Sequence, residues 1–500
     1  MRSGAAVRAA RDRTPSHFGP SGPWEGTMSQ QSWPAPLSSL VRRARGPVWV
    51  QAGRPGSEVD ATALRVRTDR LAHTFRCHGI GPGSTVALHG TPSFTQLWSL
   101  FALWSLDAQV VLLEPRPGQA EREALLELCA PQYVITFGEL YGREDLFVGE
   151  CEVLVRRRRT GRPARTGHCL VQFSSGTTGR PKAVGRTARS LLTELERLRS
   201  LTGMPGEGER VAVLGPVAHS FSLVAGVLYA LDAGATVVFP TAQTPGALAD
   251  AARGAQVVMG GPRHFAALAH AGAALTLPDL RLAVSGGDVL DAEDAGAFAR
   301  RYGVLVGQGY GTTETGMVST DLSGAAGPGA IGTPVPGVRI RLLGGVLGVH
   351  LPESPYLYED LPPHDGWLST QDLVTRDPAT GVLRLRGRVE SLTPGGVDAL
   401  RIEAVLRAHQ DVTDAVVLGA DPPQALVACG DGLTRTDLAA WCHRFLGPSG
   451  VSPRFHLVPE LPRTAGGKVL RDRAWLDGRS WFSRPAARQD GRRQERRERR

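Results

Sequence analysis

The chain is 500 residues long, 42% hydrophobic and 21% charged, which is the composition of a globular protein large enough for more than one domain. Its formal net charge of +9 is concentrated at the two ends, because residues 483–500 contribute +5 and residues 1–27 contribute +2. Arginine runs at chain ends are typical of solvated tails, so a specific nucleic-acid-binding protein is not predicted.

A cysteine-ligated metal site, a membrane span and a secretory signal are also disfavoured by the sequence. No apolar run reaches the roughly 18 residues that a membrane span needs, and the N-terminus lacks the apolar stretch of a secretory signal. We therefore expect a cytoplasmic protein without a membrane span. Because Met28 offers an alternative start, residues 1–27 are expected to be a disordered extension, and residues 483–500 a disordered tail. The six cysteines show no CxxC pair and no metal-ligand spacing: Cys77, Cys129, Cys151, Cys169, Cys429 and Cys442.

Short apolar runs alternate with helix-like segments between about residues 59 and 310. This alternation predicts layered α/β structure with largely parallel sheets. Helices are expected at 187–200 and 291–302, and the segment 323–366, rich in Gly and Pro, predicts turns and short strands. The predicted strands are 85–88, 110–113, 133–136, 170–173, 211–214, 236–239, 256–259, 281–285 and 304–307.

After about residue 386 the predicted elements become shorter. Helices at 401–409 and 436–445, with strands at 415–418 and 425–429, predict a compact α+β unit. We therefore predict a large N-terminal domain over residues 28–386 and a small C-terminal domain over residues 387–482.

Residues 170–182 read LVQFSSGTTGRPK, an apolar run followed by small and hydroxyl residues. Such a loop exposes backbone N–H groups and hydroxyls to which a polyphosphate can bind, and a lysine adds a positive charge. The kinase P-loop is excluded, because the spacing GxxxxGK[ST] is not met. The predicted nucleotide-binding residues of this loop are Ser174, Ser175, Gly176, Thr177, Thr178, Gly179 and Lys182.

This loop resembles the signature of the adenylate-forming superfamily, which includes acyl-CoA synthetases, luciferases and the adenylation domains of peptide synthetases. Further motifs follow in the family's order, so the resemblance covers roughly residues 55–476. It implies an α/β fold with a large N-terminal domain of βα subdomains and a small, mobile α+β C-terminal domain. It also implies an enzyme that joins a carboxylic acid to AMP.

Residues 308–314 read QGYGTTE after a predicted strand and resemble the family's adenine and metal segment. The resemblance implies that Tyr310 stacks on a purine and that Thr312 and Thr313 bind phosphate. Glu314 is the expected Mg²⁺ ligand, since a hard cation prefers anionic oxygen. Gly309 and Gly311 complete this predicted nucleotide site.

Residues 367–373 read WLSTQDL, where the family usually has Thr-Gly-Asp, so Asp372 matches the acid that binds the ribose hydroxyls. Gln371 stands in place of the usual glycine. Gly387-Arg388 resembles the hinge before the C-terminal domain: Arg388 is expected to reach ribose or phosphate, and Glu390 to be the pivot.

Residues 216–226, PVAHSFSLVAG, resemble the segment that borders the acyl pocket. The resemblance places His219 near the substrate carboxylate, with Phe221 and Ser222 lining the pocket. The glycines Gly260, Gly286 and Gly307 are further candidates for that lining. Residues 331–337, IGTPVPG, fit the next turn motif of the family.

Lysine occurs at two positions in a chain with 57 basic residues, Lys182 and Lys468, and each lies inside a motif. Residues 462–468, PRTAGGK, match the final motif, with Lys468 as the catalytic lysine. An ammonium at this position can stabilise the charge that develops when a carboxylate attacks the α-phosphate. Together with Lys468, the residues His219, Thr178 and Glu314 are the predicted catalytic set.

These motifs predict an AMP-forming acid:thiol ligase that uses MgATP to form an acyl-AMP and then passes the acyl group to coenzyme A. Three alternatives remain. The acceptor could be a separate acyl or peptidyl carrier protein, or the chain could be a catalytically silent nucleotide-binding protein. An amino-acid activator is disfavoured, because the stretch HSFSLVAG holds no acidic residue for a substrate ammonium.

Overall fold

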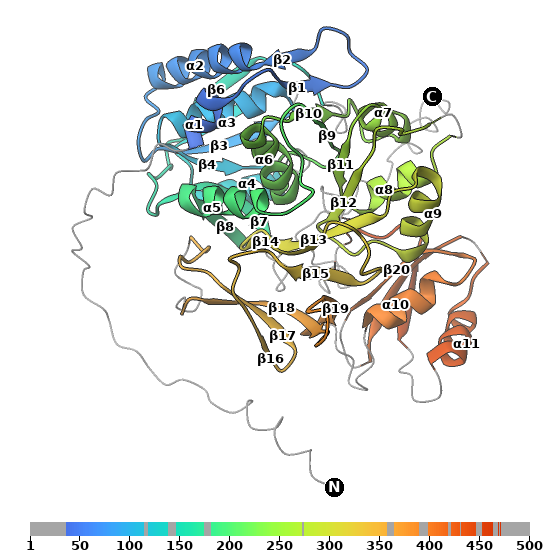
Figure 1. Ribbon diagram of the computed structural model, residues 1–500. Coiled ribbons are helices and arrows are strands. Elements are labelled where there is room, and N and C mark those ends of the chain that lie inside the picture. The colour runs from blue at the N-terminus through green and yellow to red at the C-terminus, as the bar shows by residue number, and fades with distance from the viewer. Residues whose placement is uncertain are drawn as a thin grey trace, which may run out of the picture. The chain divides into compact units, whose positions relative to one another are not determined.

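The computed structural model describes residues 37–114, 119–138, 147–174, 182–272, 275–357, 365–389, 399–418, 422–430, 432–446, 453–463, 469 and 471. Its helices and strands follow one another in the layered pattern drawn in Figure 1. Two large sheets belong to the N-terminal part of the chain, and a third, small sheet belongs to the C-terminal part.

One sheet has six strands in the order β6-β5-β3-β4-β7-β8. Strands β3, β4, β5 and β7 pair in parallel, and the edge strands β6 and β8 pair antiparallel to their neighbours. The inner strands β3, β4 and β5 are buried along their whole length, as expected for a parallel sheet covered on both faces. The strands are β3 (Thr85–Gly90), β4 (Gln109–Leu112), β5 (Tyr133–Phe137), β6 (Val153–Arg157), β7 (His168–Ser174) and β8 (Lys182–Thr187).

The other large sheet has thirteen strands in the order β16-β17-β18-β19-β15-β14-β13-β12-β11-β9-β10-β1-β2. The run from β1 to β13 is parallel, and from β13 to β16 the neighbouring strands are antiparallel. The strands of the parallel run, with the antiparallel edge strand β2, are β1 (Pro47–Gln51), β2 (Glu58–Asp60), β9 (Arg210–Val213), β10 (Thr236–Phe239), β11 (Val257–Gly260), β12 (Leu282–Gly286) and β13 (Val306–Thr312). The antiparallel strands are β14 (Gly316–Asp321), β15 (Ala330–Pro334), β16 (Ile340–Leu343), β17 (Val346–His350), β18 (Trp367–Arg376) and β19 (Leu383–Arg388).

Helices pack against these sheets, and several of them begin at a side-chain cap. Asp60, Ser93, Thr187 and Asp291 each accept a hydrogen bond from a backbone N–H in the first helical turn. Helix α3 is buried on all sides except at its last residue, so it forms part of the main core. The helices are α1 (Leu37–Arg43), α2 (Ala61–Cys77), α3 (Phe94–Ser105), α4 (Gln119–Cys129), α5 (Ala188–Arg199), the π-helix η2 (Phe221–Leu228), α6 (Tyr229–Ala233), α7 (Pro245–Ala252), α8 (Pro262–Ala269) and α9 (Ala292–Tyr302).

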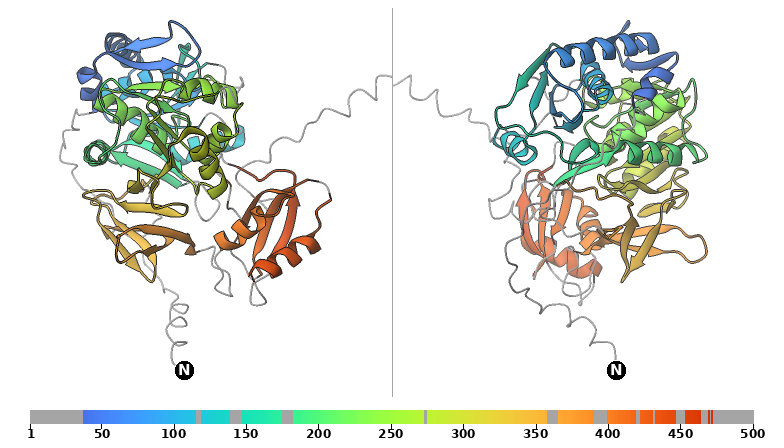
Figure 2. Two further views of the ribbon diagram at one scale, coloured as in Figure 1. Left: turned by 45° about the vertical axis from the view of Figure 1, so that its right-hand side comes forward. Right: turned by 90° about the vertical axis from the view of Figure 1, so that its left-hand side faces the viewer.

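The C-terminal part forms its own unit around a separate apolar core (Figure 2). Strand β21 lies between β20, which is antiparallel to it, and β22, which is parallel to it. The elements of this unit are α10 (Ala399–Arg407), β20 (Val412–Leu418), β21 (Gln424–Cys429), α11 (Arg435–Leu446) and β22 (Arg454–Val458). Nowhere in the described part of the chain is there a helix long and apolar enough to cross a membrane.

The predicted α/β class is confirmed, and all eleven predicted strands, nine in the N-terminal part and two in the C-terminal part, have counterparts that overlap them. Two differences have physical causes. Strand β13 continues to Thr312, so most of the motif at 308–314 lies on a strand, because β14 turns back and pairs with it. Strand β22 was not predicted, since its sequence RFHLV shows little of the apolar pattern of a strand and its pairing with β21 decides the structure. The domain boundaries at residues 386 and 482 stay predictions.

Candidate active site

The parallel strands of the large sheet end together, and glycines gather at these carboxyl ends. Gly260 is the last residue of β11 and Gly286 the last residue of β12, and Gly286 pairs with Gly309 of β13. The carboxyl edge of a parallel sheet is where ligands bind in open α/β proteins. The missing side chains leave room there for residues from other elements.

Two of these residues come from the segment around η2. A Cβ on Gly286 would lie 2.9 Å from Cε2 of Phe221, and a Cβ on Gly309 would lie 3.3 Å from the same atom. A Cβ on Gly287 would lie 3.2 Å from Cε1 of His219. The structure thus places Phe221 against the strand that carries the 308–314 motif, and His219 against Gly287 at the end of the neighbouring strand β12.

Ser222 and Gly307 lie elsewhere. The Ser222 side chain is buried against Gly215, whose Cβ would be 2.4 Å from its Oγ. A Cβ on Gly307 would be 2.5 Å from the backbone oxygen of Asp321, so this glycine permits close packing of the chain after β14. Their membership of a substrate pocket stays a prediction.

Gly260 adjoins a buried histidine that the sequence analysis did not identify. His264 Nδ1 accepts a hydrogen bond from Gly261 N at 2.8 Å, so Nε2 carries the proton and donates to Gln243 Oε1 at 2.9 Å. Burial is the main cause that lowers the pKa of His264 to about 3, with a further contribution from Arg263. This histidine is therefore a neutral structural group. The sequence around it, with Arg263 directly before it, matches no motif, so the role of His264 was not predicted.

A polar cluster joins three predicted nucleotide-binding residues from β13, β18 and β19. The Tyr310 hydroxyl donates to Asp372 Oδ2 at 2.6 Å, and Arg388 Nε lies 3.0 Å from Asp372 Oδ1. Asp372 and Arg388 are direct partners in the β18–β19 pairing. Burial, followed by the neighbouring Asp372 charge, raises the pKa of Tyr310 well above its ordinary value, so its hydroxyl stays protonated.

Gln371 sits beside this cluster in a left-handed conformation, with φ of 62°. Non-glycine residues rarely adopt this region, which explains why a glycine is usual at this position in the resembling family. The Gln371 amide donates to Ser369 Oγ at 2.9 Å, and the residue is partly exposed. The strained backbone leaves the Asp372 carboxylate in place.

A second polar cluster gathers around Glu314. Ser174, the last residue of β7, donates from Oγ to Glu314 Oε1 at 3.0 Å. Ser174 also pairs with Lys182, the first residue of β8, so the two ends of the predicted phosphate loop lie together. Residues 175–181, which include Ser175, Gly176, Thr177, Thr178 and Gly179, lie outside the described residues.

The turn that carries Glu314 is stabilised by hydrogen bonds of its threonine hydroxyl groups. Thr315 Oγ1 accepts from Thr312 N at 3.0 Å and lies 3.2 Å from Thr312 Oγ1. Thr313 and Glu314 therefore lie at the tip of a tight hairpin, and both are partly exposed.

Tyr356 is a further neighbour of Glu314 that the sequence did not indicate. It forms an isolated bridge with Val184 of β8. Burial, with the Glu314 charge as the second cause, raises the pKa of Tyr356 to about 12. The residue lies in a stretch rich in Pro and Tyr that matches no motif, so tertiary contact was needed to find it.

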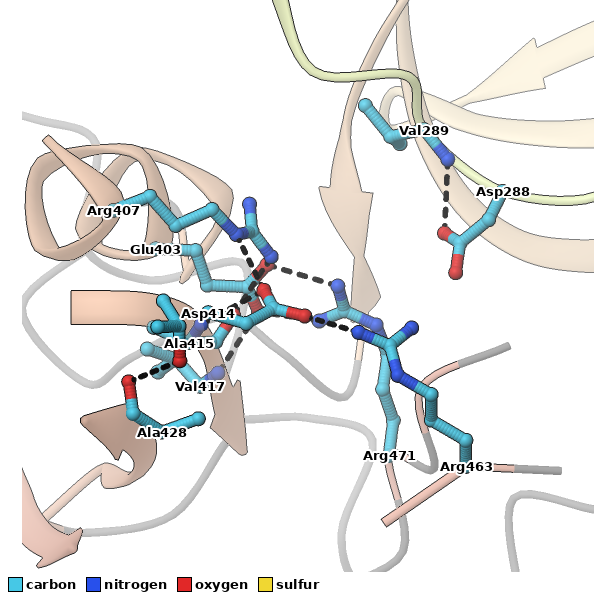
Figure 3. A network of polar contacts seen from close by, with 11 residues as sticks. Asp288, Val289, Glu403, Arg407, Asp414, Ala415, Val417, Ala428, Arg463 and Arg471 are labelled. Atoms are coloured by element: carbon cyan, nitrogen blue, oxygen red, sulfur yellow. Dashed lines mark hydrogen bonds and ion pairs between the residues drawn. The ribbon is translucent and has the colours of Figure 1, made fainter. Parts of the chain in front are cut away.

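Lys468 and Glu390 lie outside the described residues, but Arg463, Val469 and Arg471, which are near Lys468 in the sequence, are described. Val469 forms an antiparallel bridge with Arg463. Arg463 contacts Asp414, and Arg471 makes a two-pronged contact with Glu403, in which Nη2 and Oε2 are 2.9 Å apart. Figure 3 shows this network of carboxylates and guanidinium groups, which joins Arg463 to Asp414 of β20 and Arg471 to Glu403 of α10.

Comparison with known proteins agrees with this geometry. Residues 54–353 match the family model of the AMP-binding enzyme, and residues 401–468 match that of the AMP-binding enzyme C-terminal domain. A feruloyl-CoA synthase from Amycolatopsis sp is 27% identical over 485 residues, covering 88% of this chain and 97% of the relative. A sulfoacetate–CoA ligase from Cupriavidus necator is 31% identical over 350 residues, which are 62% of this chain and 67% of the relative.

A solved anthranilate CoA ligase in complex with anthranoyl-AMP has the same fold, with a TM-score of 0.73 and 20% identity, covering 89% of this chain and 97% of that chain. The expected large domain and smaller C-terminal domain are thereby confirmed as an arrangement shared with adenylate-forming enzymes. Since one family model alone spans residues 54–353, well over half of the sequence, the chain belongs to the AMP-binding enzyme family.

Proposed function

We propose that this protein is an AMP-forming acid:CoA ligase. It activates a carboxylic acid with MgATP, releasing pyrophosphate, and then transfers the acyl group from acyl-AMP to the thiol of coenzyme A. The observation that carries this proposal is the meeting of distant motif residues in two clusters, Tyr310–Asp372–Arg388 and Ser174–Lys182–Glu314. The relatives from Amycolatopsis and Cupriavidus are named a feruloyl-CoA synthase and a sulfoacetate–CoA ligase, which supports coenzyme A as the acceptor.

The first cluster suits the nucleoside. Asp372 is positioned from both sides, by the Tyr310 hydroxyl and the Arg388 guanidinium, so its carboxylate is oriented before a ligand arrives. A carboxylate can accept hydrogen bonds from both ribose hydroxyls. Arg388 is half-exposed and supplies positive charge for ribose or phosphate oxygens.

The second cluster suits the phosphates and a divalent cation. Among the described residues, no three His, Cys, Asp or Glu side chains gather into a metal-binding group. That fits Mg²⁺, which often binds through one or two carboxylates and substrate phosphates. Glu314 would hold it, and the bound cation would neutralise phosphate charge during adenylation. Thr312, Thr313 and Lys182 are placed beside Glu314 by the same turn and strand.

The chemical step needs groups at the attacking carboxylate and the α-phosphate. We assign His219 to the carboxylate side, since it lies against Gly287 at the end of β12. Lys468 and Thr178 are assigned to the phosphate oxygens on which charge develops. Activation turns the acid into a mixed anhydride, a much better electrophile for the thiol that follows.

The test is acid-dependent exchange of pyrophosphate with ATP, followed by thioester detection with coenzyme A. A panel of aromatic, aliphatic and dicarboxylic acids is supplied, with a carrier protein as the competing acceptor. Asp372→Asn should raise the KM for ATP about ten- to a hundredfold, because hydrogen bonds to a charged acceptor contribute about 1.5–3 kcal/mol. Asp69→Asn, an exposed change on α2, is the matched control. Binding of MgATP without exchange for any acid would refute the ligase and favour a silent nucleotide-binding protein.

A further inference from the structure

A buried carboxylate outside the motifs contacts the turn that carries Glu314. Glu194 lies on α5, and its Oε1 accepts a hydrogen bond from Met317 N at 2.9 Å. Its other oxygen, Oε2, would be 2.1 Å from a Cβ on Gly316. Gly316 has φ of 65°, as a tight hairpin of this kind requires, so the turn is shaped to pack directly on the Glu194 carboxylate.

The same carboxylate is bound to the strand that begins at Lys182. Arg186 of β8 donates from Nη2 to Glu194 Oε2 at 2.8 Å, and its Nε donates to Ser190 Oγ at 3.1 Å. The exposed fractions of the two side chains are 5% for Arg186 and 8% for Glu194. Each charge therefore depends on the other, because a buried ion that loses its partner is strongly destabilising.

Lys182 and Arg186 are four residues apart on one strand, so their side chains point to the same face of the sheet. Glu194 thus links two elements of the second cluster: β8, which begins at Lys182, and the hairpin that presents Glu314. Arg197, one turn further along α5, donates to Gly337 O at 3.0 Å, at the end of the 331–337 motif. Helix α5 therefore contacts the backbone next to two motifs.

We propose that Glu194 is a positioning residue for MgATP: by accepting from Met317 N and pairing with Arg186, it holds the Glu314 hairpin in register with the strand of Lys182. The inference rests on the proposed function, in which Glu314 and Lys182 serve the metal and the phosphates. Glu194 itself touches neither.

Two double variants isolate the hydrogen bond from the ion pair. Arg186→Met with Glu194→Gln removes both charges but keeps a side-chain oxygen that can accept from Met317 N. Arg186→Met with Glu194→Met removes the charges and the acceptor. Neither double variant leaves a buried charge unpaired, so both are expected to fold, which thermal unfolding checks. Glu196→Gln, an exposed change on the same helix, is the control.

The readout is the Kd for MgATP measured by calorimetry on the folded full-length chain, beside the Kd for ATP without Mg²⁺. Losing the acceptor should weaken MgATP binding about tenfold relative to the glutamine variant, which should stay near wild type. ATP binding without Mg²⁺ should change much less, because the hairpin places the metal-binding carboxylate.

Equal MgATP affinities in the two double variants, with only the unfolding temperature shifted, would overturn the inference and leave the proposed function intact. A wild-type protein that fails to bind MgATP would overturn both. If the methionine double variant lost tenfold in affinity for ATP without Mg²⁺ as well as for MgATP, that result would contradict a role of Glu194 in positioning Glu314.

Discussion

Glu403 is the centre of the charged network in the C-terminal unit, and its replacement tests how that unit is held together. Its side chain is 0% exposed, and its Oε1 accepts from Val417 N at 2.8 Å. Its oxygens also bind Arg407 and Arg471, so one carboxylate compensates two guanidinium groups (Figure 3). Glu403→Gln keeps the shape but removes the charge, and the new amide group would oppose guanidinium N–H donors.

The expected cost follows from the burial of each partner. Breaking a fully buried ion pair costs about 3–5 kcal/mol. Arg471 and Arg407 retain exposures of 21% and 30%, so water relieves part of the lost interaction. Asp414 also remains to bind Arg407 at 2.9 Å. We therefore expect a loss of about 2–4 kcal/mol in the unfolding free energy of the C-terminal unit.

Differential scanning calorimetry of the full chain measures this change, and for a unit of this size each kcal/mol lowers the midpoint by roughly 4–8 °C. Urea unfolding followed by limited proteolysis within the C-terminal unit gives an independent value. Glu460→Gln, exposed in the same unit, controls for the loss of a negative charge. A loss below about 1 kcal/mol, or one equal to that of the control, would refute the view that Glu403 stabilises the unit.

Three further changes are predicted. Lys468→Arg should lower pyrophosphate exchange about 10²–10³-fold, nearly as much as Lys468→Ala, because a planar guanidinium cannot replace a compact ammonium. Lys182→Arg should lower exchange less. Near-normal exchange in Lys468→Arg would contradict this prediction. His264 is neutral in the folded state, where its pKa is about 3, whereas in the unfolded chain the same histidine binds a proton below about pH 6.5. This one histidine should therefore lower the free energy of unfolding by about 1.4 kcal/mol per pH unit as the pH falls from 6 to 4. Acid titrations of urea unfolding should show that slope reduced in His264→Gln; an unchanged slope would show that the histidine does not contribute. Gln371→Gly should leave the free energy of unfolding unchanged or raise it by up to about 1 kcal/mol, since glycine adopts the positive φ without strain. Gln371→Val should lower it by about 1–3 kcal/mol. Equal melting temperatures for the two variants and the wild type would contradict the strain at this position.

The sequence by itself determined the fold class, most of the parallel strands and the family. Buried parallel strands require apolar runs, and a loop that approaches phosphate requires small residues, so both leave local patterns. Residues 170–182 and 308–314 are patterns of this kind, and the family model over residues 54–353 agrees with them. The positive φ at Gln371 also lies where the sequence departs from the family's glycine.

Only the tertiary structure decided which distant residues meet. Tyr310 and Asp372 are 62 positions apart, and Glu194 and Met317 are 123 positions apart, yet each pair forms a hydrogen bond. The helical period places Glu194 on the apolar face of α5 with Leu191, Leu195 and Leu198, and Glu196 on the opposite, exposed face. It does not tell which groups a buried glutamate meets: its partners Arg186 and Met317 are decided only when α5 packs against β8 and β14.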